Sequence, residues 1–296
     1  MARTRFRSDP GLTWRMGGVG LGLVLLYVAF GAVLMSLVDI GPALVITLGM
    51  AWGQWYFSDS LALKSMGARI VEPEQAPELH AMIDRLVALA DMPKPKVAVA
   101  VTDVPNAFAT GRSPSHAAVC VTTGIMQRLD ADELEGVLAH ELAHVAHRDV
   151  SVMTVASSMG LLAGFLTRWG FWLGGSRRDG RSGAAMIVVV LVSVVVAFLS
   201  HLLTRALSRY RELSADRSGA YLTGRPTKLA SALTKISGEM AAIPTEDLRE
   251  VQQMNAFFFS PAVNGTTVRE LMSTHPSLER RLEQLARISA DLADRG

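Results

Sequence analysis

The segment His140-Glu141-Leu142-Ala143-His144 decides how the rest of the chain is interpreted. Histidines at positions i and i+4 of a helix lie one turn apart, about 6 Å along the axis, so both rings can bind one ion. Glu141 is rotated by about 100 degrees from His140, which places its carboxylate beside a water held at that ion. The pattern predicts a zinc ion with Glu141 as the general base. The alternative is a chance match on a helix whose histidines only pack or face water.

The residues before this segment favour a helix. Asp130 precedes Glu133 by three positions, which is a capping-box pattern, and apolar residues then recur at helical spacing through Leu138 and Leu142. Two imidazoles and a carboxylate on such an apolar helix would be costly to bury without partners. A bound metal would supply one.

A catalytic zinc has three protein ligands, so one more is needed. His147 shares the face of His140 but lies about 10 Å along the axis from it, and we expect it beside the site or at the surface. Glu212 is the better candidate, because it belongs to a separate predicted helix. Asp216, four residues later, shares its face and could accept the outer N–H of a ligating histidine. The alternative for this pair is an ordinary solvated helix surface.

Half of the residues are hydrophobic, which is high for a soluble protein. Four apolar stretches with charged edges are candidate membrane spans, because a spanning helix needs roughly 20 mostly apolar residues. They cover residues 16–38, 40–57, 150–167 and 183–203. A cleaved secretory leader is the alternative for the first stretch, and long buried core helices are the alternative for all of them.

Basic residues predict the orientation of the first two spans. Four arginines precede the first span and Lys64 and Arg69 follow the second, so both ends of this hairpin should be cytoplasmic, as should residues 58–149. The loop between the second pair carries Arg177, Arg178 and Arg181, which conflicts with a full crossing. Either the first hairpin dominates the topology, or residues 150–203 pack partly on protein.

Other features limit the function classes and outline the remaining elements. The net charge of +2 is carried by scattered residues, which argues against nucleic-acid binding, and the single Cys120 excludes an internal disulfide. Periodicity predicts helices at residues 75–90, 205–222, 228–240 and 277–292. Alternating segments at 96–102 and 117–123 predict a small β-hairpin, with residues 104–109 as an exposed edge at its turn.

The chain resembles the HtpX-type membrane metalloproteases, which are gluzincins related to the CAAX prenyl endopeptidases. The resemblance rests on the first apolar hairpin, Asn106-Ala-Phe-Ala-Thr-Gly111, the His140–His144 segment, the second apolar pair, Glu212 to Asp216, and Thr274-His275-Pro276. It implies that Asn106 and Ala107 border the cleft on an edge strand and contact the substrate backbone. It also implies that His275 and an arginine, Arg281 or its neighbour Arg280, lie near the developing oxyanion.

We therefore expect a mainly α protein with a small β-sheet: a membrane-anchored, zincin-like metallopeptidase domain with about four transmembrane or membrane-associated helices. The expected parts are a transmembrane hairpin (1–58), the first part of the peptidase domain (59–149), a second hydrophobic hairpin (150–204) and the second part of the peptidase domain (205–296). One Zn²⁺ per chain is expected, bound by His140, His144 and Glu212.

The expected function is cleavage of misfolded or damaged membrane proteins at the plasma membrane by a multi-pass enzyme whose catalytic domain faces the cytoplasm. The partners are the lipid bilayer and unfolded or membrane protein substrates. Two alternatives stay open: a specialised processing protease for lipidated or signal-like peptides, and a non-enzymatic membrane scaffold that uses zinc structurally.

Overall fold

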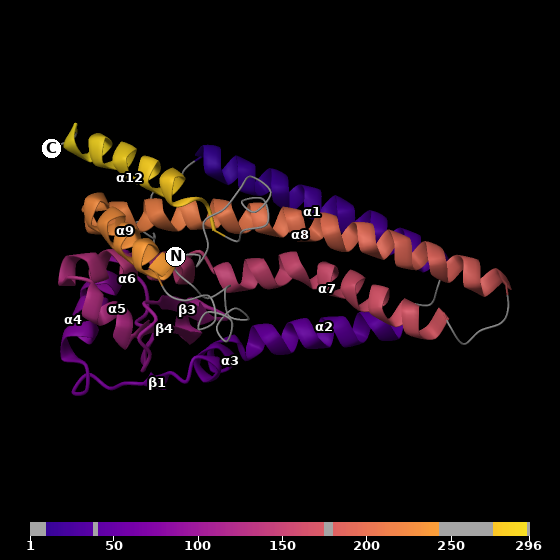
Figure 1. Ribbon diagram of the computed structural model, residues 1–296, viewed down its shortest axis with the longest axis horizontal. Helices are drawn as coiled ribbons and strands as arrows, with labels where there is room; N and C mark the ends of the chain where they lie inside the picture. Colours follow the sequence, from indigo (N-terminus) through magenta and orange to yellow (C-terminus); the bar gives the residue numbers. More distant parts are fainter. Residues whose placement is uncertain (1–9, 38–40, 175–179, 243–274, 295–296) are drawn as a thin grey trace.

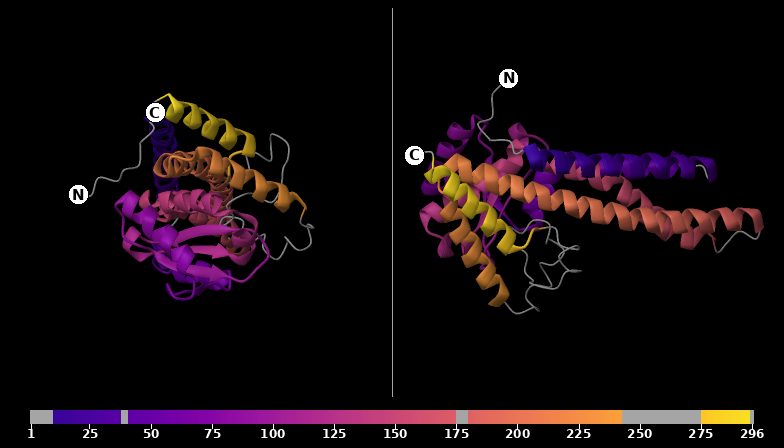
Figure 2. Two further views of the ribbon diagram at one scale, coloured as in Figure 1. Left: turned by 90° about the vertical axis from the view of Figure 1, so that its left-hand side faces the viewer. Right: turned by 90° about the horizontal axis from the view of Figure 1, so that it is seen from above.

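The computed structural model describes residues 10–37, 41–174, 180–242 and 275–294. Long helices run side by side from a compact head that contains the sheet (Figure 1, Figure 2). The long helices, here called the bundle, are α1 (Pro10–Leu37), α2 (Gly41–Tyr56), α7 (Asp149–Gly174) and the first part of α8 (Gly180–Thr223). The mainly α class with a small sheet is confirmed.

The head combines a four-stranded sheet with shorter helices. Its first part contains α3 (Ser58–Ser65), β1 (Arg69–Ile70), α4 (Pro77–Ala90), β2 (Lys96–Ala100), β3 (Ala107–Gly111), a short 3-10 turn (Pro114–His116), β4 (Ala117–Thr122), α5 (Thr123–Arg128) and α6 (Ala131–Ala146). Its second part contains the end of α8, α9 (Pro226–Ala242) and α12 (Leu278–Ala293). The two parts, separated by the α7–α8 hairpin in the sequence, share one hydrophobic core that includes Ile83, Leu138, Leu233 and Leu285.

The predicted hairpin between residues 96–102 and 117–123 is wrong. The strand order is β1-β2-β4-β3, and β2 pairs with β4 in parallel. The hairpin is formed by β3 and β4 instead, with Phe108 opposite Cys120. Parallel neighbours need a crossover, and the chain uses the residues between β2 and β4 to build β3 on the outer side of β4. As a result β3 is an edge strand.

Local signals fix where the helices of the head begin and end. Both hydrogen bonds of the capping box are present at the start of α6: the Asp130 side chain accepts from the N–H of Glu133 (2.8 Å), and the Glu133 side chain accepts from the N–H of Asp130 (2.9 Å). Helix α8 continues without a break from the apolar stretch into the head, as the sequence predicts. It stops before Gly224, which has a φ of 67° that favours glycine.

Two helices of the described chain, within residues 10–36 and 187–223, are long and apolar enough to cross a membrane. Helix α2 has 16 residues, and the apolar part of α7, residues 149–164, is also short. Only 17% and 22% of the two long apolar windows are buried, so they are not core helices of a soluble domain. Large apolar side chains face outward on all four helices, among them Val28, Val45, Val155 and Leu191. Such continuous apolar surface fits contact with lipid.

Candidate metal centre and active site

Helices α6 and α8 converge so that three predicted ligands meet. One ligand atom each from His140, His144 and Glu212 lie within 4.8 Å of one another. The Nε2 atoms of the two imidazoles are 3.0 Å apart, and the Glu212 carboxylate lies 3.7 Å from Nε2 of His140 and 3.3 Å from Nε2 of His144. The spacing along α6 thus brings both rings to one point, and α8 brings the carboxylate to it.

The close approach of these two helices depends on Gly219 of α8. A Cβ atom at this position would lie 2.9 Å from the backbone nitrogen of His140 and 3.1 Å from the carbonyl carbon of Ala139. Real side chains do not tolerate such contacts with backbone, so any larger residue would push α8 away from α6. This glycine is a signal that the sequence carries and that helical periodicity does not reveal.

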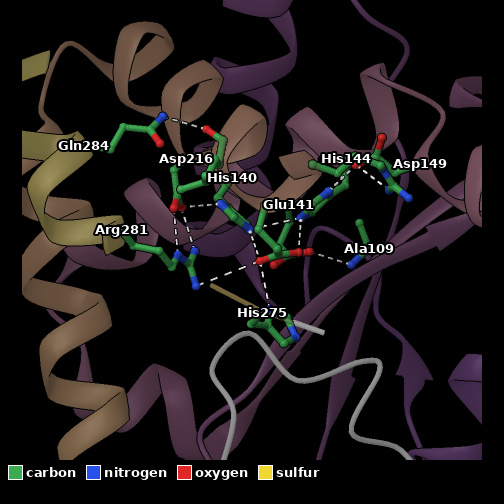
Figure 3. Close-up of polar contacts among 12 residues, drawn as sticks. Ala109, His140, Glu141, His144, Asp149, Asp216, His275, Arg281 and Gln284 are labelled. Atoms are coloured by element: carbon green, nitrogen blue, oxygen red, sulfur yellow. Dashed lines mark hydrogen bonds and ion pairs between the residues drawn. The ribbon is translucent and has the colours of Figure 1, made fainter. Parts of the chain in front are cut away.

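Each imidazole is oriented by a buried carboxylate on its outer nitrogen. Nδ1 of His140 lies 2.9 Å from Asp216, and Nδ1 of His144 contacts Asp149 (Figure 3). A carboxylate accepts a hydrogen bond, so both rings carry their proton on Nδ1 and turn the Nε2 lone pair inward. The prediction for Asp216 matches its position, whereas the contact of Asp149 was not predicted.

The donor set fits zinc. Two inward-facing imidazole lone pairs and a carboxylate would repel one another at these distances without a cation between them. Two nitrogens and one carboxylate are ligands that Zn²⁺ takes, and three protein ligands are the number found in catalytic sites. The described residues therefore fit one zinc ion held by His140, His144 and Glu212.

Glu141 lies beside this group and outside it. Glu141 is only 4% exposed, and its Oε2 accepts a hydrogen bond from the Ala109 backbone N–H (2.8 Å). Burial raises the pKa of the Glu141 carboxyl. A carboxylate with a raised pKa is better suited to take up a proton near neutral pH.

A cavity of about 710 Å³ opens over the site. Helix α6 contributes His140, Glu141 and His144 to its wall, and β3 contributes all five of its residues. The remaining walls come mainly from α2, α3, α7 and α8, with His275 from the segment before α12. The cavity therefore runs from the head toward the bundle, and the edge strand lies along one side of it.

The backbone of β3 shows which groups are open to the cavity. Asn106 C=O accepts from the N–H of Thr122 (2.9 Å), and Asn106 N–H donates to the Thr122 hydroxyl (2.9 Å). Because antiparallel strands alternate, the backbone groups of Ala107, Ala109 and Gly111 point away from β4. Ala107 is on the edge strand and lines the cavity. Asn106 is fully buried and lies next to the cavity wall without being part of it, so its contact with substrate stays a prediction.

His275 and Arg281 both reach the ligand group but differ in their surroundings. Nδ1 of His275 lies 3.0 Å from Oε2 of Glu212, and His275 lines the cavity. Arg281 donates two hydrogen bonds to Asp216 (2.7 and 2.6 Å) and lies 3.9 Å from Glu212. It is buried, whereas Arg280 is exposed, so Arg281 is the arginine that faces the site. Thr274 lies outside the described residues.

His147 is not a member of the ligand group. It is the residue after the last turn of α6, where its Nε2 lies 3.5 Å from the Ser218 hydroxyl. Burial lowers the pKa of His147 to about 4, so the ring is neutral at physiological pH. This position agrees with a residue beside the site.

Comparison with known proteins identifies the family. Residues 73–289 match the model of Peptidase family M48. The chain is 54% identical to Protease HtpX homolog 1 of Streptomyces coelicolor, with 99% of this chain and 97% of the relative covered. It is 52% identical to the Protease HtpX homolog of Moorella thermoacetica, covering 99% of each chain.

The fold is also similar to the crystal structure of S. mikatae Ste24p. The TM-score is 0.55 at 17% identity, and the alignment covers 91% of this chain and 62% of the Ste24p chain. At this identity the likeness concerns the fold alone. The present chain has membrane-type helices, matches the M48 model and aligns over almost its whole length with HtpX proteases. It therefore belongs to peptidase family M48, among the HtpX-type membrane metalloproteases.

Proposed function

We propose that this metalloprotease is a zinc-dependent endopeptidase that cleaves misfolded or damaged membrane proteins, with its catalytic head on the cytoplasmic side of the plasma membrane. The observation that carries the chemistry is the meeting of His140, His144 and Glu212 within 4.8 Å, with Glu141 beside them. The substrate class rests on kinship and on the bundle attached to the head. The orientation rests on the basic residues that flank the first apolar hairpin.

Zinc held by His140, His144 and Glu212 would supply Lewis-acid activation of the attacking water and of the scissile carbonyl. Glu141 takes the proton from that water through its carboxylate while the water oxygen bonds to the peptide carbon. The same carboxyl group then gives the proton to the leaving amine as the C–N bond breaks. The Ala109 N–H, which donates to Oε2, keeps this carboxylate in place through both transfers.

The edge strand supplies a way to hold an unfolded substrate. Backbone groups of Ala107 and Gly111 face away from β4, so an extended peptide can add to this edge through main-chain hydrogen bonds. Such bonds do not depend on side chains, which suits an enzyme that cleaves many sequences. His275, next to Glu212 in the cavity wall, would be the side chain that donates to the developing oxyanion.

Arg281 has a different role in this proposal. Its guanidinium is committed to Asp216 by two hydrogen bonds, and Asp216 in turn lies against His140. It therefore orients His140 through Asp216. Its positive charge also stabilises the carboxylates of Asp216 and Glu212.

The test uses the detergent-purified chain and an unfolded substrate such as casein. Wild-type protein is expected to cleave it, to stop on addition of a chelator and to recover when zinc is returned. Glu141→Gln is expected to keep about one zinc per chain and to lose cleavage, because the amide cannot take a proton. Cleavage by Glu141→Gln at the wild-type rate would refute the role of this carboxylate.

The product pattern separates the proposed function from a specialised processing protease. Many cleavage positions in an unfolded membrane protein are expected for quality control. A single defined cut, in a signal-like or lipidated peptide only, would favour processing instead.

A further inference from the structure

We propose that Asp149 and Arg211 form a positioning pair that fixes the His144 ring for metal binding. This inference rests on the proposed function, because it requires His144 to be a ligand. Neither residue is a candidate site residue from the sequence alone. The pair would do for His144 what Asp216 and Arg281 do for His140.

The two arrangements are alike in geometry. At His140, Nδ1 lies 2.9 Å from Asp216, which accepts from Arg281. At His144, Nδ1 contacts Oδ2 of Asp149, and the same oxygen lies 2.6 Å from the Arg211 guanidinium. Figure 3 shows Asp216 and Asp149 on opposite sides of the two histidines. Each ligand histidine thus has its own carboxylate, and each carboxylate has its own arginine.

Asp149 and Arg211 are both buried, so the charge of each needs the other to offset it. Asp149 is 4% exposed and Arg211 is 6% exposed, so either charge alone would be costly in this environment. The Asp149 carboxylate, paired with Arg211, accepts the Nδ1–H of His144. The ring then keeps its Nε2 lone pair directed at the ion.

The backbone brings Asp149 to this place by a sharp turn. Helix α6 ends at Ala146, and Arg148 has a φ of 55°, in the left-handed region that non-glycine residues seldom adopt. The turn makes Asp149 the first residue of α7, back beside His144. Arg211 directly precedes Glu212 on α8, so the pair also ties the helix that carries the third ligand to the start of α7.

The test measures zinc affinity of the full chain in detergent by competition with a chelator, together with the visible spectrum of the cobalt form. Asp149→Asn is expected to weaken zinc binding about 10- to 100-fold and to change the cobalt spectrum, because the ring loses its charged partner. Arg211→Gln is expected to weaken binding less. The double variant should be no weaker than Asp149→Asn, since Arg211 acts through Asp149.

Lys235→Gln is the matched control. Lys235 of α9 lies 2.7 Å from the buried carboxylate of Glu133. Glu133 is on α6, as His140 and His144 are, but neither histidine bonds to this pair. The control removes the cationic partner of a buried carboxylate on α6, the helix that carries His144, and should leave zinc affinity and the cobalt spectrum unchanged. Equal effects of Lys235→Gln and Arg211→Gln would show a general loss of stability and would overturn the positioning role.

Other results separate this inference from the proposed function. Failure of the wild-type chain to bind zinc would refute the proposed function itself. Wild-type affinity and spectrum in Asp149→Asn would refute only the positioning pair, as would single effects that multiply in the double variant. If Asp149→Asn does not fold because Arg211 is left unpaired, the double variant removes both charges and is compared directly with wild type.

Discussion

The two ends of helix α8 differ in which side chains they bury. In the bundle its side chains are apolar and many face outward, such as Leu191 and Val195. In the head the same helix buries Arg211, Glu212 and Asp216, each with an oppositely charged or imidazole partner. One continuous helix therefore joins a surface suited to lipid to a core of charges arranged around the candidate metal site. We therefore expect substitutions of polar residues to have larger effects in the head than in the bundle.

The largest effect is expected from removing a ligand in the head. His140→Ala should reduce zinc from about one per chain to near zero and abolish cleavage, because two ligands no longer suffice. The measurements are elemental analysis and a casein assay. His147→Ala is the matched control and should keep its zinc. Loss of zinc from the His147 variant alone would reverse the assignment.

A methyl group at the crossing of α6 and α8 should have the next largest effect. Gly219→Ala places a Cβ 2.9 Å from the His140 backbone and should lower the free energy of unfolding by about 1–3 kcal/mol, with weaker zinc binding. Gly31→Ala in α1, where nothing lies within 4 Å of the added atom, should be neutral or slightly stabilising. Thermal unfolding of both variants measures the difference. Equal stabilities would mean that the close crossing is not required.

A smaller, pH-dependent effect is expected at Glu133. Burial alone would raise the pKa of this carboxyl, but hydrogen bonds from Lys235, Ser231 and the Asp130 backbone lower it below 4.5. A depressed folded-state pKa stabilises the protein above the unfolded pKa, and this contribution is lost as the pH falls through the folded value. Glu133→Gln should therefore lower the melting temperature at pH 7 and reduce the difference from wild type in acid. A difference that grows as the solution is acidified would contradict this.

The smallest effect is expected in the bundle. The Tyr27 hydroxyl donates to the Ala156 carbonyl and accepts from the Ser200 hydroxyl (3.0 Å), joining α1, α7 and α8. Hydrogen bonds between membrane helices contribute about 0.6 kcal/mol on average. Tyr27→Phe should thus lower stability by less than about 1 kcal/mol and leave cleavage unchanged. A loss comparable to that of Gly219→Ala would remove the contrast between bundle and head.

The sequence was most informative where a signal is local. The capping box at Asp130 and the spacing of His140 and His144 predicted α6 and its two candidate ligands, and Glu212 with Asp216 predicted one face of α8. Each of these patterns lies within a few residues, and helical geometry converts it directly into a shared face.

Pairings that depend on the path of the chain could not be predicted in the same way. Strands β2 and β4 are neighbours in the sheet, but β3 lies between them in the sequence. No local pattern shows which strand pairs with which. The contact of Asp149 with His144 requires a left-handed backbone conformation at Arg148. Arginine seldom adopts this conformation, so the residue type does not predict the turn. The exclusion of Asn106 from the cavity follows from its bonds to Thr122, which only the strand register shows.

X-ray absorption at the zinc edge of the purified, full-length chain tests the convergence of α6 and α8 most directly. The expected spectrum has two imidazole nitrogens at about 2.0–2.1 Å and oxygen donors, and it should change when Glu212 is replaced by Gln. Cys120, the single thiol, is buried in the sheet. A sulfur neighbour at about 2.3 Å, or full zinc occupancy with an unchanged spectrum in Glu212→Gln, would contradict a site made by these two helices.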